Sequence, residues 1–394
     1  MSLTEVQNPP VKKTVPAPDI QVRTIPLVQV LWRVAVVAVL LYCFLVGVKT
    51  LGGSIKLAGA GFAKGLFDLQ ANPFISLMAG ILSTCLFQSS SVTTSMIVGL
   101  VSGGVLTMQG AVPMIMGANI GTSVTNTLVS LGCFRDRESF KRAFSAATVH
   151  DFFNLLSVAV LLPLELMTGF LSKTAMATSG FLYGSIAGGK FHSPVKAAIK
   201  PAAGAIKGFV TKTLALDGGT GGFVMAVIAA AIIFGALFLI VKTMESLMRS
   251  RKAEVIDRLM SKNVGMSLGF GVLLTIAVQS SSITTSLLVP MAGAGLLSLG
   301  SIFPVTVGAN IGTTVTALIA ALAGNAAGLA IALAHLFFNL VGTMIWFVAP
   351  RMRAVPMALA EWLGSVTLRH RGYAVAYVLG VFFIVPFALI AVVK

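Results

Sequence analysis

Long apolar stretches separated by short polar or basic segments dominate the pattern along this chain. Two of these stretches, Pro73–Gly104 and Asn263–Gly295, are apolar at both ends but polar in the middle. Others reach the roughly 20 apolar residues that a helix needs to cross a bilayer. These are Leu27–Val48, Ala143–Phe170, Phe223–Val241, Ala326–Val348 and Tyr373–Val393. The pattern therefore predicts an all-α integral membrane protein.

The polar block Gln88–Ser95 divides the first interrupted stretch into two arms that are each too short to span a bilayer. A single helix would place a glutamine and several hydroxyl groups in lipid. The pattern therefore predicts a re-entrant helical hairpin, whose polar tip is shielded by protein or by a water-filled cavity. The second interrupted stretch predicts a hairpin of the same kind.

The chain contains an internal duplication. Residues 88–95 read QSSSVTTS and residues 279–286 read QSSSITTS, and GANIGT occurs at both 117–122 and 308–313. Both pairs are 191 positions apart (279 − 88 and 308 − 117). HDFFN at 150–154 and HLFFN at 335–339 are 185 apart, so the second copy is six residues shorter. Three elements in the same order at nearly constant spacing predict two structural repeats, at 70–170 and 261–350.

The remaining segments divide around the two repeats. We predict that the two repeats are inverted, which requires an odd number of membrane crossings between them. The basic segments Arg135–Arg142 and Lys242–Lys262 both favour the cytoplasm, but lysines in the linker oppose this assignment, so the sidedness of the hairpins stays open. We predict a flexible cytoplasmic tail without a signal peptide at 1–26, a transmembrane helix and connector at 27–69, an inter-repeat linker at 171–220, a transmembrane helix and basic loop at 221–260, and an amphipathic segment with the last transmembrane helix at 351–394.

Each GANIGT motif places two glycines, an asparagine and a threonine inside an apolar segment. Glycine tolerates backbone conformations that interrupt a helix. The carbonyl and amide groups freed by an interruption need partners inside a membrane, and bound ions or substrate can supply them. We therefore predict a broken transmembrane helix in each repeat. Interrupted helices at corresponding positions of two repeats are typical of a transporter's binding site.

The serine-rich tips are suited to a tetrahedral oxyanion. Serines that begin a helix combine hydroxyl donors with unpaired backbone N–H groups and the positive end of the helix dipole. Glutamine adds an amide that both donates and accepts hydrogen bonds. The candidate anion-binding residues are Gln88, Ser89, Ser90, Ser91, Gln279, Ser280, Ser281, Ser282, Asn119 and Asn310.

The same motifs contain no Lys or Arg, so an anion in a low-dielectric cavity would need a bound cation to balance its charge. Carbonyl and hydroxyl oxygens are hard ligands suited to sodium. Asp151 adds a carboxylate within an apolar segment, where such groups usually have a function; a structural pairing with a basic residue is the alternative. The candidate sodium ligands are Gln88, Gln279, Ser91, Ser282, Thr93, Thr284, Thr122, Thr313 and Asp151.

Composition narrows the classes of function. Charged residues make up 10% and hydrophobic residues 56% of the 394 residues, whereas soluble domains carry about a quarter charged residues. The net charge of +16 is attributed to loops facing cytoplasm and anionic lipid, not to nucleic acid. The sequence lacks the HExxH, GxSxG and P-loop patterns, so we predict no enzyme. We expect no cofactor and no metal other than sodium.

At this point a family resemblance is visible. The paired QSSS and GANIGT motifs, and the run GTSVTNTLVSLGCFRDRESFKRAFSAATVHDFFNLLSVAVLLPLE at 121–165, resemble the type II sodium-dependent phosphate cotransporters. The resemblance implies sodium-driven phosphate uptake across the cell membrane by a two-repeat fold with re-entrant hairpins that works by alternating access. It also implies that Gln88–Ser91 and Gln279–Ser282 hold phosphate and sodium.

The resemblance carries two further implications. Asp151 matches the acidic position that contributes an extra sodium site in electrogenic relatives, where electroneutral relatives carry Gly, so we expect electrogenic transport. Residues 171–220 contain no Cys and no Asn, unlike the glycosylated, cysteine-paired loop of animal relatives, which indicates a bacterial-type member. A sodium-coupled carrier of a carboxylate or sulfate, and an anion channel, stay open as alternatives. The partners expected are phosphate, sodium and lipid, and the sequence does not predict an oligomeric state.

Overall fold

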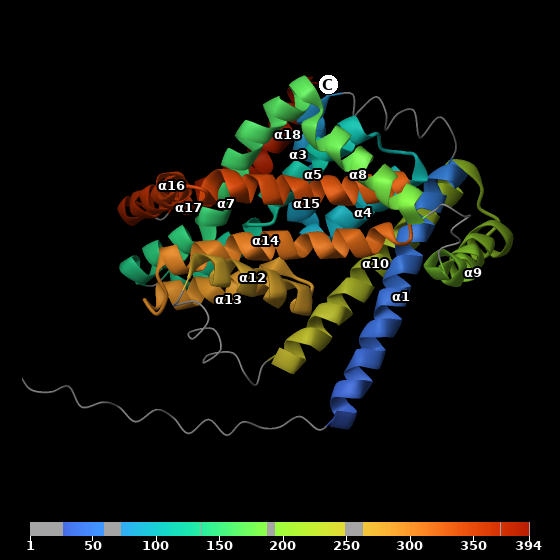
Figure 1. Cartoon of the computed structure of the whole chain (residues 1–394), viewed down its shortest axis with the longest axis horizontal. Helices are drawn as coiled ribbons and strands as arrows, with labels where there is room; N and C mark the ends of the chain where they lie inside the picture. The colour runs from blue at the N-terminus through green and yellow to red at the C-terminus, as the bar shows by residue number, and fades with distance from the viewer. Residues whose placement is uncertain are drawn as a thin grey trace, which may run out of the picture.

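A computed structural model describes residues 27–58, 72–134, 136–186, 194–248, 263–370 and 372–393, and within these ranges the chain forms helices and no strand (Figure 1). The predicted tail at 1–26 and most of the predicted basic loop Lys242–Lys262 lie outside them. The α-helices are α1 (Leu27–Ala58), α3 (Pro73–Phe87), α4 (Ser90–Gly103), α5 (Met108–Gly121), α6 (Val124–Ser130), α7 (Arg137–Thr168), α8 (Phe170–Ile186), α9 (Pro194–Gly208), α10 (Gly218–Met248), α12 (Val264–Val278), α13 (Ser281–Gly293), α14 (Leu299–Ala321), α15 (Ala326–Phe347), α16 (Pro350–Arg369), α17 (Gly372–Leu379) and α18 (Val385–Val393). Between them lie a 3-10 helix, η1 (Leu131–Cys133), and two π-helices, η2 (Phe209–Thr213) and η3 (Gly380–Ile384).

Among the described residues, six helical segments are long and apolar enough to cross a membrane. Five of them correspond to the spans predicted from the sequence. The sixth, Leu299–Ala321, contains the second GANIGT motif and runs without interruption, so the prediction of a broken helix in the second repeat is wrong. In the first repeat the helix is interrupted at Thr122–Ser123, starting at the last residue of the motif, between α5 and α6.

The GANIGT glycines serve close packing and do not break the helix. Gly117 on α5 lies so close to the α3 backbone at Leu77 that a Cβ atom would overlap a carbonyl group, and Gly308 on α14 stands in the same relation to Leu268 on α12. On the hairpin arms, Gly80 and Gly271 make the corresponding close contacts with the backbones of α5 and α14. In both repeats, therefore, the first arm of the hairpin and the helix that follows the hairpin pack backbone to backbone.

Both hairpins form as pairs of short helices joined at the predicted tips. Gln88 and Gln279 adopt left-handed backbone conformations, with φ of 52° and 57°, and turn the chain from α3 to α4 and from α12 to α13. Ser89 and Ser280 then cap the new helices by accepting a hydrogen bond of 3.3 Å from the N–H three residues later. A left-handed residue other than glycine costs roughly 1–3 kcal/mol, so a glutamine at both tips indicates a role for its side chain.

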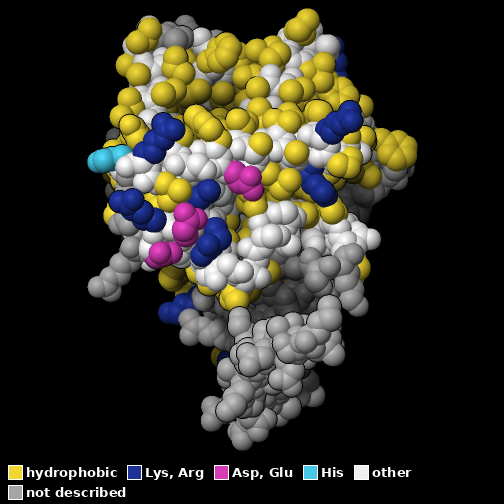
Figure 2. Space-filling view, turned by 90° about the vertical axis from the view of Figure 1, so that its left-hand side faces the viewer, with side chains coloured by type: hydrophobic (Ala, Val, Ile, Leu, Met, Phe, Trp, Pro, Cys, Tyr) yellow, Lys and Arg dark blue, Asp and Glu magenta, His cyan; other side chains and the backbone are white. Residues whose placement is uncertain are grey.

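The helices are arranged as a pair of central elements with others packed around them (Figure 1). α14 and α15 run side by side across the centre, and α1 packs along α10. Figure 2 shows the end of the molecule that carries α16 and α17, where Lys, Arg, Asp and Glu gather across the middle and an almost wholly hydrophobic surface lies above them. A band of charge beside an apolar surface is typical of a boundary between water and membrane.

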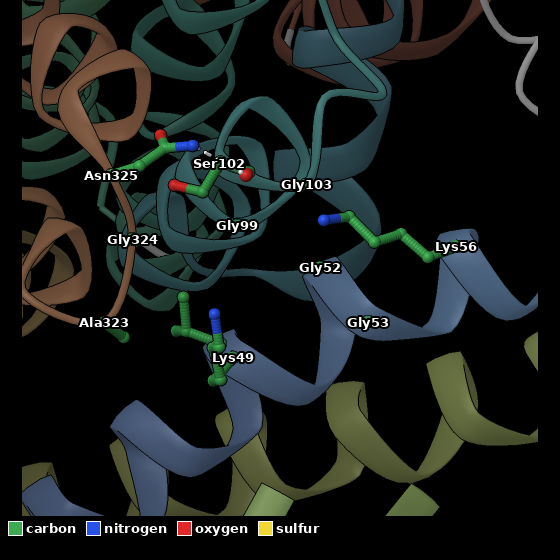
Figure 3. A pocket seen from close by; sticks show the side chains of 11 residues that line it. Lys49, Gly52, Gly53, Lys56, Gly99, Ser102, Gly103, Ala323, Gly324 and Asn325 are labelled. Carbon is green, nitrogen blue, oxygen red and sulfur yellow. Dashed lines mark hydrogen bonds between the residues drawn. The ribbon is translucent and has the colours of Figure 1, made fainter. Parts of the chain in front are cut away.

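The far end of each hairpin is held by the other repeat. In the first hairpin, the carbonyl of Ser102 accepts a hydrogen bond of 3.1 Å from the amide of Asn325, just before α15 (Figure 3). In the second, the carbonyl of Gly293 accepts hydrogen bonds from Ser139 Oγ at 2.9 Å and from the Arg142 guanidinium at 2.8 and 3.1 Å. Positions 102 and 293 are again 191 apart. The repeats therefore hold each other at equivalent positions, by a neutral amide bond at the first hairpin and by bonds that include a charged guanidinium at the second.

Candidate functional site

A cavity of about 230 Å³ lies between the two hairpin tips. Gln88, Ser89 and Ser91 line it from the first tip, and Gln279 and Ser280 line it from the second. One wall is apolar and comes from α10, through Phe234, Leu237 and Phe238. The structure thus brings two motifs that are 191 positions apart in the sequence to a single site.

The two tip glutamines are held in equivalent ways. Gln88 Oε1 accepts a hydrogen bond of 3.1 Å from Thr125 Oγ1, and Gln279 Oε1 accepts one of 3.1 Å from Thr316 Oγ1. Each amide nitrogen donates to the carbonyl three residues earlier, at 2.5 and 2.7 Å respectively. Because a primary amide has two N–H donors, each glutamine is fixed in place and keeps one donor for a ligand.

α4 and α13 begin at this cavity. The first N–H groups of a helix have no acceptor within that helix, and they lie at the positive end of its dipole. Ser89, Ser91 and Ser280 add hydroxyl groups to these amides. None of the described residues that line the cavity is a Lys or Arg. Such a set of neutral donors suits an oxyanion whose charge is balanced by bound cations.

Several other predicted site residues are not among those that line the cavity. Ser90 and Ser281 are buried in the first turns of α4 and α13, and Ser282 is half-buried. The four predicted threonines each donate to the carbonyl four residues earlier in the chain; they are Thr93, Thr122, Thr284 and Thr313. Such bonds use the hydroxyl proton and leave oxygen lone pairs that can bind a cation.

Asn119 and Asn310 belong to a buried polar network and do not line the cavity. The Asn310 amide donates to Asn154 Oδ1 at 2.9 Å and to Asn339 Oδ1 at 2.8 Å. Asn154 donates in turn to the Asn119 carbonyl at 2.8 Å, and His335 Nε2 lies 3.4 Å from Asn119 Oδ1. These side chains come from both repeats, so the network joins the repeats in the core of the molecule.

Asp151 is fully buried on α7, close to the interruption between α5 and α6. Its Oδ2 accepts a hydrogen bond of 3.0 Å from the Tyr377 hydroxyl, and Ser123 at the interruption faces the same carboxylate. Within the described residues, Oδ1 has no partner and no basic side chain pairs with Asp151. The second repeat has Leu336 at this position and an uninterrupted α14. The carboxylate and the helix interruption are therefore features of the first repeat alone.

Sequence reasoning missed three parts of this site. Thr125 and Thr316, which hold the tip glutamines, recur at the repeat offset of 191, and that recurrence is a signal that could have assigned them this role. The α10 wall around Phe234 lies outside both repeats, as does Tyr377, and each stands in an ordinary apolar stretch. Nothing in the local sequence distinguishes them from residues that face lipid.

Comparison with known proteins finds the same family that the sequence motifs resemble. The profile of the family described as Na+/Pi-cotransporter matches residues 43–186 and 231–362. The chain is 34% identical over 416 residues to sodium-dependent phosphate transport protein 2A of Rattus norvegicus, covering 88% of this chain and 65% of that protein. It is 35% identical over 428 residues to the 2A protein of Mus musculus, covering 90% and 67%, and 32% identical over 437 residues to the 2B protein of Homo sapiens, covering 88% and 63%. The chain thus spans about two thirds of the length of these relatives. No solved structure matches it.

Proposed function

This chain belongs to the Na+/Pi-cotransporter family, and on that premise we propose that it carries inorganic phosphate across a membrane together with sodium ions. The observation that carries the proposal is the shared cavity, because both serine-rich tips contribute donors to it. Among the described residues, six helical segments of membrane-spanning length agree with a multi-pass membrane protein. We place it in the cell membrane, as a transporter and not an enzyme.

Charge balance supplies the coupling. Phosphate bound by neutral hydroxyls, amides and helix N-termini would keep its negative charge in a cavity with an apolar wall, which is unfavourable unless cations bind with it. Sodium bound by nearby oxygens would lower this cost, and phosphate would lower the cost of binding sodium. Each solute therefore raises the affinity for the other, as reciprocal linkage requires.

The repeat architecture supports alternating access. In this proposal the two repeats are inverted, and each hairpin is re-entrant, with its tip at the depth of the shared cavity. α3, α4, α12 and α13 have 13 to 15 residues each, about 20 Å at 1.5 Å per residue, which is too short to cross a core about 30 Å thick. Such hairpins place an irregular polar turn inside protein, where the membrane tolerates it.

Asp151 is proposed as part of a sodium site that has no equivalent in the second repeat. Its buried carboxylate lies beside an interrupted helix, has one oxygen without a partner and is not paired with a basic side chain. A buried carboxylate without a basic partner favours a cation. An additional sodium ion at this position would make transport electrogenic, because the charge carried inward would then exceed the charge of the phosphate.

Replacing Asp151 by glycine is therefore expected to preserve phosphate uptake and to lower the charge moved per phosphate. The measurement is simultaneous current and radiolabelled phosphate flux across a planar or oocyte membrane. Asp136→Gly, an exposed carboxylate that caps the start of α7, is the matched control and should leave the ratio unchanged. An unaltered ratio in the Asp151 variant would remove this residue from the sodium sites.

The proposed function is tested by uptake of radiolabelled phosphate into proteoliposomes under an inward sodium gradient or an equal potassium gradient. We expect uptake that requires sodium, and that is blocked by unlabelled phosphate or arsenate but not by sulfate or succinate. Block by sulfate or succinate would identify another anion as substrate. Equal uptake in both salts would replace sodium coupling by a channel or by coupling to protons.

A further inference from the structure

Tyr377 is the residue that the last helical segment contributes to the surroundings of Asp151. Its hydroxyl donates a hydrogen bond of 3.0 Å to Asp151 Oδ2, across 226 positions of the sequence. Asp151 Oδ1 has no partner within the part of the chain that the structure describes. One oxygen of this buried carboxylate is therefore occupied by a neutral donor, and the other is available to a ligand.

Aromatic side chains hold the Tyr377 ring in a fixed orientation. Phe144 and Phe382 meet the ring edge-on, with centroids 6.2 and 6.3 Å away, and Phe152 lies at 6.4 Å. Phe144 and Phe152 come from α7, the helix that carries Asp151. Because a closely packed ring has little room for another rotamer, the fold directs the phenol oxygen at the carboxylate.

The backbone that follows Tyr377 departs from a regular α-helix. α17 is followed by η3, where the Val385 N–H bonds to the Gly380 carbonyl five residues earlier. Pro386 has no N–H to donate to the Phe382 carbonyl, and this accounts for the wide turn. η3 and α18 pack against α3 (Figure 1). The wide turn thus lets one segment contact both the first hairpin and the buried carboxylate, and turns of this kind occur frequently at functional sites.

The tyrosine hydroxyl and a cation stabilise the same negative charge. A buried carboxylate without a basic partner is costly to keep ionised, and a hydrogen bond to the charged group lowers that cost. Once sodium is bound to Asp151, the charge is already balanced, so the same hydrogen bond contributes less. The Tyr377 hydroxyl therefore stabilises the empty site more than the occupied site.

We propose that Tyr377 is a positioning residue that acts through Asp151, and that it weakens sodium binding there by holding one carboxylate oxygen while the site is empty. This inference rests on the proposed sodium site at Asp151. A carrier that takes up sodium on one side of the membrane must release it on the other, and a donor that stabilises the empty carboxylate favours release. Because α17 lies outside both repeats, this control belongs to the first-repeat site alone.

The direct test is the sodium dependence of thermal stability, measured on the full-length protein in detergent, with choline replacing sodium and no phosphate present. An ion that binds only the folded protein raises its unfolding temperature according to its concentration and affinity. Tyr377→Phe removes the hydroxyl and keeps the ring. We expect this variant to need roughly three- to tenfold less sodium for a given rise in unfolding temperature, since a hydrogen bond to a charged group is lost mainly from the empty state.

Two comparisons separate this role from a structural one. Tyr373→Phe, the matched control, removes an exposed hydroxyl from the same helix and should leave the sodium dependence unchanged. In an Asp151→Gly background, Tyr377→Phe should have no further effect on the sodium dependence, because the donor has lost its acceptor. An unchanged or higher sodium requirement in Tyr377→Phe would overturn the proposal, and so would an equal shift in the Asp151→Gly background.

Transport gives a second readout. Tyr377→Phe should lower the half-maximal sodium concentration for phosphate uptake by the same factor and preserve the charge moved per phosphate, because Asp151 stays in place. A lower maximal rate with an unchanged half-maximal sodium concentration would show a purely structural role and overturn the proposal. If the unmodified protein shows no sodium-dependent uptake, the proposed function fails, whereas the thermal measurement still decides whether Tyr377 acts on an ion at Asp151.

Discussion

Alanine in place of Gln279 is expected to reduce sodium-dependent phosphate uptake by roughly 10- to 100-fold, the loss that follows from removing a hydrogen bond to a charged group. The substitution removes an amide that Thr316 holds in place at 3.1 Å and that lines the cavity between the hairpin tips. Ser280→Ala should act in the same direction, because it removes both a hydroxyl in the cavity and the cap of α13.

The control for this prediction is Gln109→Ala. Gln109 is an exposed glutamine in the first turn of α5, so its loss removes the same chemical group away from the cavity. Uptake is measured in proteoliposomes that contain equal amounts of each protein, quantified after reconstitution. Normal uptake by both Gln279→Ala and Ser280→Ala would show that the hairpin tips do not bind the substrate.

Gly117→Ala is expected to destabilise the folded protein strongly, by about 3 kcal/mol or more, the upper range for overpacking a close-packed interior. The added Cβ would overlap the Leu77 carbonyl on α3. No change of rotamer can relieve a clash between a Cβ and backbone, so α3 and α5 must move apart. The measurement is thermal unfolding of the purified protein in detergent, followed by tryptophan fluorescence or by loss of the monodisperse peak.

Gly235→Ala is the matched control, because a Cβ at Gly235 on α10 would meet no atom within 4 Å. Alanine favours a helix over glycine by about 1 kcal/mol, so this variant should be as stable as the unmodified protein or slightly more stable. Gly308→Ala in the second repeat should behave like Gly117→Ala. Unfolding temperatures that are equal for Gly117→Ala and Gly235→Ala would contradict the packing that the structure shows.

The GANIGT motifs show both what the sequence predicts and where prediction from it fails. Their recurrence at an offset of 191 correctly pairs Gly117 with Gly308, but it does not reveal what either glycine does. Glycine allows a helix to break and also allows two helices to touch, and these alternatives produce the same local sequence. Only the position of Leu77 on a neighbouring helix decides between them, and that position is a property of the tertiary fold.

The candidate site also contains features that the sequence predicts and features that only the tertiary fold reveals. The turns at Gln88 and Gln279 could be predicted because a polar segment between two apolar arms is incompatible with lipid, whatever the rest of the fold does; that these glutamines bind substrate stays a prediction. Asn119 lies in the polar network that joins the repeats, a position that its chemistry alone does not reveal, and its role in binding substrate stays a prediction. Tyr377 could not be predicted as the partner of Asp151, because the two are 226 positions apart and α17 belongs to neither repeat.

The interlocking hairpin ends have an energetic consequence for a carrier that exposes its cavity to each side in turn. In the proposed alternating-access cycle, opening one end would break the neutral bond between Asn325 and Ser102, whereas opening the other would break the bonds that Ser139 and Arg142 make to Gly293. Charge-assisted bonds are roughly twice as strong as neutral ones. Although the two halves share one architecture, this difference would make the Ser102 end the easier one to open in the proposed alternating-access cycle.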